Sequence, residues 1–287
     1  MLSSPFYLLL IPPLACVIAF IYVMRVIATP PEGHARDASQ KIKAHQGQVV
    51  ACIGDSLTHG NIGVCWVEHL RRQLSDYFFI NGGINGDVAW QLLQRLPPIL
   101  ECKPDIVFLL IGSNDAMGSF NSSSGERYQK SNKLPHKPSF ELYKEHLGLL
   151  LDGLAHVPQV LVCTLPPVGE VPDSPMNQHL AQFNQFIHEI TSDKNRTLID
   201  VSAAMWQQLN QRTYPAIHDY DSKMSVLGPR IMNACLRHYL FKTPWDTIAE
   251  SRGQWLLFDQ IHLGERGAQV IEGLILNHLD KTSDTTL

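Results

Sequence analysis

The chain has 287 residues, which is enough for one sizeable domain whose core needs neither a disulfide nor a metal ion to be stable. Its 23 basic and 27 acidic residues give a net charge of −4 and form no basic stripe, which excludes a nucleic-acid partner. None of the six cysteines belongs to a C-x-x-C pair, which argues against a zinc site and a disulfide framework. We expect no metal and no cofactor, and the sequence leaves the oligomeric state open.

The first 28 residues are expected to form a membrane anchor or a signal segment. The stretch from Pro5 to Met24 is apolar and uncharged, and at about 1.5 Å per residue it can cross a bilayer core of about 30 Å. The sequence therefore predicts a transmembrane segment and a single-pass, membrane-anchored protein. A cleaved signal peptide is the alternative, because Val26-Ile27-Ala28 is a passable cleavage site. The basic residues after the span favour a cytoplasmic domain, but the side of the membrane stays open.

Composition divides the rest of the chain into three parts. Residues 29–48 are polar and open with Pro30-Pro31 and Gly33, which indicates a linker. Residues 49–280 are expected to form the main domain, and residues 281–287 form a polar tail.

Within the main domain, strand patterns alternate with helix patterns. Five apolar runs are typical of buried strands, at 49–53, 77–81, 105–111, 159–164 and 197–201. Amphipathic helix patterns separate them, the first with Trp66, Val67, Leu70 and Leu74 on one face, and a last helix is expected over 266–279. Strands separated by helices predict βαβ units and a parallel sheet.

Two segments are longer than the connections of such a fold require. Residues 117–138 are rich in Ser, Asn, Lys and Gly, and we expect a long, mobile polar loop there. Residues 202–258 contain two adjacent apolar rows with i,i+4 spacing, formed by Ile231, Cys235, Tyr239, Met232, Leu236 and Leu240. This stripe fits either a helix packed on the sheet or a wall over a site that binds an acyl chain.

Candidate functional residues follow three of the predicted strands. Ser56 lies in Gly54-Asp55-Ser56-Leu57 directly after the first strand, Gly86 follows the second, and Asn114 follows the third. In open α/β folds, ligands bind at this carboxyl edge of the sheet. Ser56 is therefore either a nucleophile or, as serine often is, the cap of the next helix.

A late motif supplies the partners that a nucleophilic serine requires. Asp259-Gln260-Ile261-His262 contains the only Asp-x-x-His in a chain with thirteen histidines. An aspartate three residues before a histidine can reach its Nδ1 atom, which leaves Nε2 free to take a proton from Ser56.

Together these motifs resemble the blocks of the SGNH/GDSL hydrolase family. The four blocks occur in the family's order, at Gly54–Leu57, Asn81–Asp87, Gly112–Asp115 and Asp259–His262. The long 117–138 and 202–258 segments depart from the family pattern where its members shape substrate access, so the substrate does not follow from the resemblance.

The resemblance implies a role for each matching residue. Ser56 would be the nucleophile, His262 the base and Asp259 the acid that orients it. The backbone N–H groups of Ser56 and Gly86 and the side-chain amide of Asn114 would form the oxyanion hole. The implied fold is a flavodoxin-like three-layer α/β/α sandwich with a five-stranded parallel sheet in the order 2-1-3-4-5.

These features predict a serine ester hydrolase that forms an acyl-enzyme and acts on lipid or lysophospholipid esters. A carbohydrate O-acetyl esterase, which needs only a small acyl pocket, is the alternative within the same chemistry. A catalytically silent, membrane-anchored binding protein on the same fold is the alternative of another class. A nucleotide-binding protein is disfavoured, because Gly82-Gly83-x-x-Gly86 lacks the full dinucleotide fingerprint.

Overall fold

Five parallel strands form the centre of the molecule. The computed structural model describes residues 6–35, 38, 42, 45–216 and 218–284. The strands are β1 (Gln48–Gly54), β2 (Tyr77–Gly83), β3 (Ile106–Leu110), β4 (Gln159–Cys163) and β5 (Thr197–Ile199). They pair in the order β2-β1-β3-β4-β5, all parallel, so the predicted sheet is confirmed.

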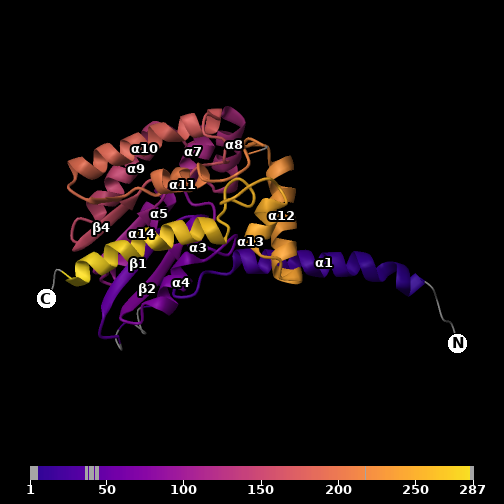
Figure 1. The fold of residues 1–287 in the computed structure, drawn as a ribbon, viewed down its shortest axis with the longest axis horizontal. Coiled ribbons are helices and arrows are strands. Elements are labelled where there is room, and N and C mark those ends of the chain that lie inside the picture. Colours follow the sequence, from indigo (N-terminus) through magenta and orange to yellow (C-terminus); the bar gives the residue numbers. More distant parts are fainter. Residues whose placement is uncertain (1–5, 36–37, 39–41, 43–44, 217, 285–287) are drawn as a thin grey trace.

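Helices cover both faces of this sheet, as Figure 1 shows. On one face lie α4 (Trp66–Gln73), α11 (Val201–Leu209) and α14 (Glu265–Asp284). On the other lie α5 (Ala89–Gln94), α9 (Phe140–Gly153) and α10 (Pro175–Asp193), with the short α6 (Leu96–Leu100) after α5. Because helices cover both faces, β3 is buried along its whole length, which explains its continuous apolar sequence.

The carboxyl ends of β1 and β3 each lead directly into a short helix. These helices are α3 (Ser56–His59) and α7 (Ser113–Ser119). Gly112 makes the second transition possible, because it has a φ of +132° and a Cβ atom there would lie 2.6 Å from the ring of Tyr143. The backbone therefore turns sharply at this edge and brings residues 113–115 close to residues 55–57.

The segment 117–138 is not the long polar loop that its composition predicts. It contains the helix α8 (Ser122–Ser131), whose first turn is capped by Asn121, with the side chain accepting a hydrogen bond from the Ser124 N–H at 2.9 Å. The polar composition conceals a helix that is stabilised by its cap and by contacts with other parts of the chain.

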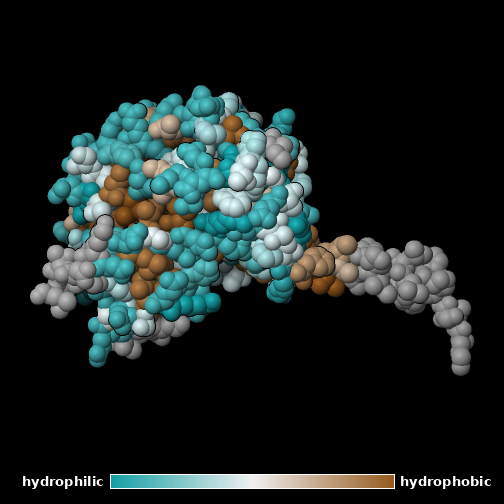
Figure 2. Space-filling model, viewed as in Figure 1, coloured by the Kyte–Doolittle hydropathy of each residue, from teal (hydrophilic) through white to brown (hydrophobic). Residues whose placement is uncertain are grey.

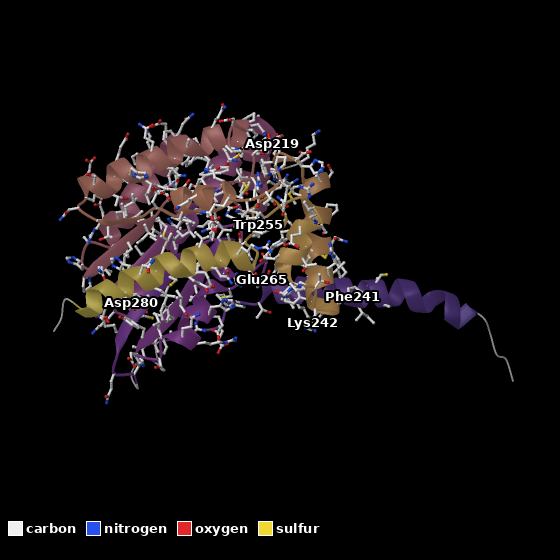
Figure 3. All side chains as sticks on the ribbon, in the orientation of Figure 1. Asp219, Phe241, Lys242, Trp255, Glu265 and Asp280 are labelled. Atoms are coloured by element: carbon white, nitrogen blue, oxygen red, sulfur yellow. The ribbon has the colours of Figure 1, made fainter. Side chains whose placement is uncertain are left out.

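The long segment before the last helix is also largely helical. It contains α11, then α12 (Met224–Phe241) and α13 (Trp245–Glu250). Helix α12 packs beside α1 (Phe6–Ala28), and its exposed end at Phe241 and Lys242 lies next to α1 in Figure 3.

The predicted N-terminal transmembrane segment has to be corrected. The apolar stretch does form α1, but among the described parts of the chain no helix combines the length and apolarity needed to cross a membrane. The end of α1 belongs to the domain instead: Val23 is completely buried, and the Asn61 side chain donates to the carbonyls of Val26 and Ile27. The expected single-pass, membrane-anchored localisation and the membrane partner are therefore not supported.

Apolar side chains are nevertheless exposed where α1 leaves the domain. Figure 2 shows hydrophobic residues gathered at this place. On α1 they are Val17, Ile18, Phe20, Ile21 and Met24.

Candidate active site

Ser56, His262 and Asp259 form one hydrogen-bonded chain at the carboxyl edge of the sheet. The Nε2 atom of His262 lies 3.0 Å from the Oγ atom of Ser56, although 206 positions separate them in the sequence. The Nδ1 atom of His262 lies 2.7 Å from Oδ2 of Asp259. All three residues are buried, with Asp259 completely so. The structure thus brings together the three side chains that the sequence predicts as catalytic.

The loop before α14 holds Asp259 and His262 in this geometry. The second carboxylate oxygen of Asp259 accepts hydrogen bonds from the backbone N–H groups of Ile261 and His262, at 3.0 and 2.7 Å. Burial raises the pKa of Asp259, but the charge of His262 and these hydrogen bonds outweigh burial and leave the pKa below its ordinary value. Asp259 is therefore an ionised hydrogen-bond acceptor that can hold the imidazole in one orientation.

Ser56 is not the cap of α3. Asp55 occupies that position, and its side chain accepts a hydrogen bond from the Leu57 N–H at 3.0 Å. The hydroxyl of Ser56 is left facing His262. Burial raises the pKa of Asp55 to about 7, although the Leu57 N–H and the charge of His262 act in the opposite direction. Asp55 thus contributes to the site by fixing the turn in which Ser56 stands.

Gly86 and Asn114 lie on the same cavity as Ser56 and His262. Gly86 has a φ of +82° in a turn closed by the hydrogen bond from the Asp87 N–H to the Ile84 carbonyl, a conformation that glycine adopts without strain. The Nδ2 atom of Asn114 lies 3.0 Å from the Asp87 carbonyl and 3.3 Å from Oδ2 of Asp55. Both Nδ2 hydrogens of Asn114 thus have oxygen partners in this structure, and Ser56, Gly86 and Asn114 line one cavity.

The cavity at this site has a volume of about 420 Å³, and most of its lining surface is apolar. Helix α12 contributes Met224, Leu227 and Ile231, and of the apolar stripe predicted in the 202–258 segment only Ile231 is among the residues that line this cavity. Helix α8 contributes Arg127 and Tyr128. An aliphatic wall opposite a polar catalytic edge suits a ligand with an apolar portion.

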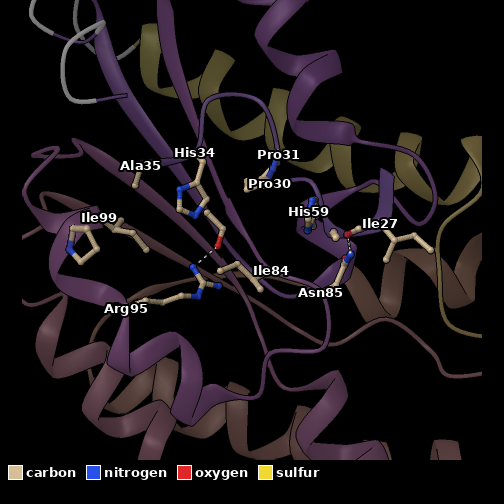
Figure 4. A pocket seen from close by; sticks show the side chains of 13 residues that line it. Ile27, Pro30, Pro31, His34, Ala35, His59, Ile84, Asn85, Arg95 and Ile99 are labelled. Carbon is tan, nitrogen blue, oxygen red and sulfur yellow. Dashed lines mark hydrogen bonds between the residues drawn. The ribbon is translucent and has the colours of Figure 1, made fainter. Parts of the chain in front are cut away.

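A second cavity, of about 500 Å³, lies beside the first but contains neither Ser56 nor His262. Figure 4 shows it between the segment that follows α1 and the loop after β2. Arg95 lines it and donates to the carbonyls of Gly82 and Gly54, at 2.6 and 2.8 Å, and to the carboxylate of Asp87. Arg95 thus donates hydrogen bonds to the carboxyl ends of β1 and β2. We assign it a structural role, which is to hold these two strand ends together next to the first cavity.

Sequence reasoning missed three side chains that support the site. Tyr128 and Asn132 contact the predicted oxyanion residues, and Glu170 binds the backbone before Asp259. Glu170 carries a usable signal, since a single acid stands among apolar residues in Val168-Gly169-Glu170-Val171. The other two lie in the polar segment and carry no such signal.

No group of three His, Cys, Asp or Glu side chains in the described residues is arranged to hold a metal ion. The arrangement of Ser56 and His262 allows proton transfer between a hydroxyl and an imidazole. Backbone and amide N–H groups on the same cavity are of the kind that can stabilise a negative oxygen.

Comparison with known proteins agrees with this architecture. Solved structures that share the fold include Axe2, an acetylxylan esterase from Geobacillus stearothermophilus, with 18% identity and a TM-score of 0.57 over 81% of this chain and 94% of that chain. The acetyl xylan esterase AlAXEase matches with 17% identity and a TM-score of 0.53 over 80% of this chain and 98% of that chain. A search of curated proteins found no match. The sequence profile of the GDSL-like lipase/acylhydrolase family matches residues 52–270, a range that includes all four motifs, and the chain belongs to this family.

Proposed function

We propose that the protein is a serine ester hydrolase in which Ser56 is the nucleophile. The observation that carries this proposal is the continuous hydrogen-bonded chain from Asp259 through His262 to Ser56. His262 removes the hydroxyl proton as Ser56 attacks the ester carbonyl, and later returns a proton to the leaving alcohol. In the second half-reaction, His262 removes a proton from water as the water attacks the acyl-enzyme carbonyl. The proton then returns to the Ser56 oxygen as the carboxylic acid leaves.

The negative oxygen of each tetrahedral intermediate requires donors that are already in place. We assign this task to the N–H groups of Ser56 and Gly86 and to the amide of Asn114, which stand on one cavity. One such donor typically contributes about 3 kcal/mol to transition-state stabilisation.

A similar spacing in a structural relative supports the catalytic assignment. Structures of catalytic mutants of Axe2 replace one serine, one aspartate and one histidine, and the latter two are three positions apart in that protein. Asp259 and His262 have the same separation here. We place the domain that performs the reaction at residues 49–280, after a linker at 29–48.

For the substrate, we favour esters with an aliphatic acyl chain, such as lipid or lysophospholipid esters. The aliphatic side chains of α12 and the volume of about 420 Å³ support this choice, because they allow more apolar surface to be buried than an acetyl group offers. A carbohydrate O-acetyl ester is the second candidate, and the acetylxylan esterases among the structural relatives support it.

Labelling with a fluorophosphonate probe tests the chemistry without knowledge of the substrate. The wild type should be labelled and Ser56→Ala should not, while Ser122→Ala, which alters an exposed serine on α8, should be labelled like the wild type. A wild-type protein that folds but neither reacts with the probe nor cleaves any ester would instead be a silent binding protein. Rates on p-nitrophenyl esters from acetate to dodecanoate then separate the two substrate classes.

A further inference from the structure

Helix α8 and the residue after it contact both of the predicted oxyanion-hole residues that lie outside the nucleophile loop. The hydroxyl of Tyr128 donates to Oδ1 of Asn114 at 2.8 Å. The Nδ2 atom of Asn132 donates to the carbonyl of Gly86 at 2.7 Å. These contacts join residues 14 and 46 positions apart, so α8 lies against the loop after β2 and against the start of α7.

The contact with Tyr128 helps to fix the orientation of the Asn114 amide. An asparagine amide can rotate by half a turn and exchange its oxygen with its nitrogen. The Asp87 carbonyl can only accept, so it favours Nδ2 on its side, as does Oδ2 of Asp55 at 3.3 Å, and the hydroxyl of Tyr128 donates to the oxygen on the other side. Burial raises the pKa of Tyr128 well above its ordinary value, so the hydroxyl remains a donor throughout the working pH range.

The contact with Asn132 restrains Gly86, whose backbone is less restricted than that of residues with a side chain. Gly86 has no side chain to limit its φ and ψ angles, and its N–H direction depends on them. Asn132 binds the carbonyl of Gly86 and also lies 3.2 Å from Oε1 of Gln91 on α5, so the anchor is tied to a second helix. The turn that presents the Gly86 N–H is therefore braced from the side of α8.

We propose that Tyr128 and Asn132 are positioning residues that preorganise the oxyanion hole, and that this is the task of the 117–138 segment. The proposal rests on the ester hydrolase function proposed above. Helix α8 can serve as a support because it is itself held in place: Arg127 donates to the Ser222 carbonyl at 2.8 Å, and the Asn121 amide donates to the Ser222 hydroxyl at 3.1 Å. Donors that are fixed before the reaction need no reorganisation while charge develops, which is the source of their effect.

Removal of one hydroxyl tests the first contact. Tyr128→Phe should lower kcat roughly fivefold to tenfold with little change in KM, because the lost bond orients a group that acts mainly in the transition state. Tyr214→Phe is the matched control, since its hydroxyl donates to the Gln254 carbonyl outside the catalytic cavity, and it should keep wild-type rates. A rise in KM with unchanged kcat would show that Tyr128 binds substrate in the ground state and would overturn the assignment.

A double-mutant cycle then identifies the route of the effect. If Tyr128 acts through Asn114, Tyr128→Phe should have almost no effect on kcat when Asn114 is already alanine. The same loss in both backgrounds would mean that Tyr128 acts on the substrate directly or on general stability, and the proposal would fail.

Asn132→Ala tests the second contact, and here we expect a several-fold loss of kcat that adds to that of Tyr128→Phe. Gln129→Ala is the control on the same helix, because its side chain donates a hydrogen bond to the exposed Pro135 carbonyl and does not line the catalytic cavity. Wild-type kcat in both Tyr128→Phe and Asn132→Ala, together with loss of all activity in Ser56→Ala, would overturn the positioning roles while the hydrolase function stands. Full activity of Ser56→Ala would instead overturn the function itself.

Discussion

The guanidinium of Arg212 lies 2.7 Å from the carboxylate of Glu170, and this buried ion pair stands next to the loop that carries Asp259. The same carboxylate accepts hydrogen bonds of 2.7–2.9 Å from three successive backbone N–H groups, those of Trp255, Leu256 and Leu257. Glu170 thus accepts the hydrogen bonds of a stretch of backbone N–H groups that begins four positions before Asp259. The carboxylate of Glu170, in the loop after β4, therefore holds the candidate catalytic loop against the domain.

Replacement of this carboxylate should therefore destabilise the protein and disturb the site. We expect Glu170→Gln to lower the free energy of unfolding by about 3 kcal/mol, because it leaves the buried Arg212 without a counter-charge. Urea unfolding measures this loss, and Glu126→Gln, which removes an exposed ion pair, should change stability little. Equal stabilities of the two variants would show that the buried pair does not hold the loop.

The sequence reveals the strands and the catalytic motifs because their signals are local. Buried parallel strands are continuous apolar runs, so β1 and β3 are visible without any knowledge of their neighbours. The Asp259–His262 pair is visible because the two residues that must touch are three positions apart. The bond from His262 to Ser56 spans 206 positions, and only the order of the motifs in a known family makes it predictable.

Asp259→Asn tests the orientation of His262. An asparagine keeps the size of the side chain but can offer an N–H group to Nδ1, which stabilises the wrong imidazole tautomer. We expect kcat to fall by about four orders of magnitude, while the circular dichroism spectrum and the affinity for substrate stay unchanged. The variant should not be rescued by divalent metals, and wild-type activity that chelators abolish and zinc restores would contradict this mechanism.

The wall formed by α12 should control acyl-chain length. Ile231→Phe adds bulk inside the cavity and should lower kcat/KM for octanoate esters about tenfold relative to acetate esters, a typical effect of a changed apolar pocket. Leu240→Phe adds similar bulk at an exposed position of the same helix and serves as the control. Equal losses for octanoate and acetate would place the acyl chain elsewhere and favour the O-acetyl ester alternative.

Two expectations failed because tertiary contacts override composition. Residues 117–138 contain few apolar residues, so their composition indicates a loop; the helix α8 depends on the Asn121 cap and on partners such as Asn114 and Ser222. The apolar stretch at the N-terminus correctly predicts a helix, but its pattern cannot show that Val23 is buried against the domain.

The pH dependence of stability should reveal Asp115, a second buried carboxyl group near the site. Its carboxylate accepts a hydrogen bond from the Ala89 N–H at 3.0 Å, where α5 begins. Burial raises its pKa from 3.8 to about 7, with the Ala89 N–H acting in the opposite direction. The folded pKa thus lies above the unfolded value, so between about pH 4 and pH 7 the folded protein binds a proton that the unfolded chain releases.

The sign of the effect follows from this difference in proton binding. The contribution of Asp115 to stability is fully present below about pH 4 and is lost as pH rises to about 7, at a slope of at most about 1.4 kcal/mol per pH unit. Asp115→Asn keeps an acceptor for the Ala89 N–H but cannot ionise, so it should gain stability relative to the wild type as pH rises through this window. Urea unfolding of both proteins at pH 4.5, 6, 7.5 and 9 measures the gain, which should level off above about pH 7. Burial also raises the pKa of Asp55 to about 7, and the charge of Asp55 contributes to the raised pKa of Asp115, so the difference between the two proteins reports Asp115 together with its interaction with Asp55. A difference that stays constant from pH 4.5 to 9 would mean that Asp115 is ionised in the folded protein throughout.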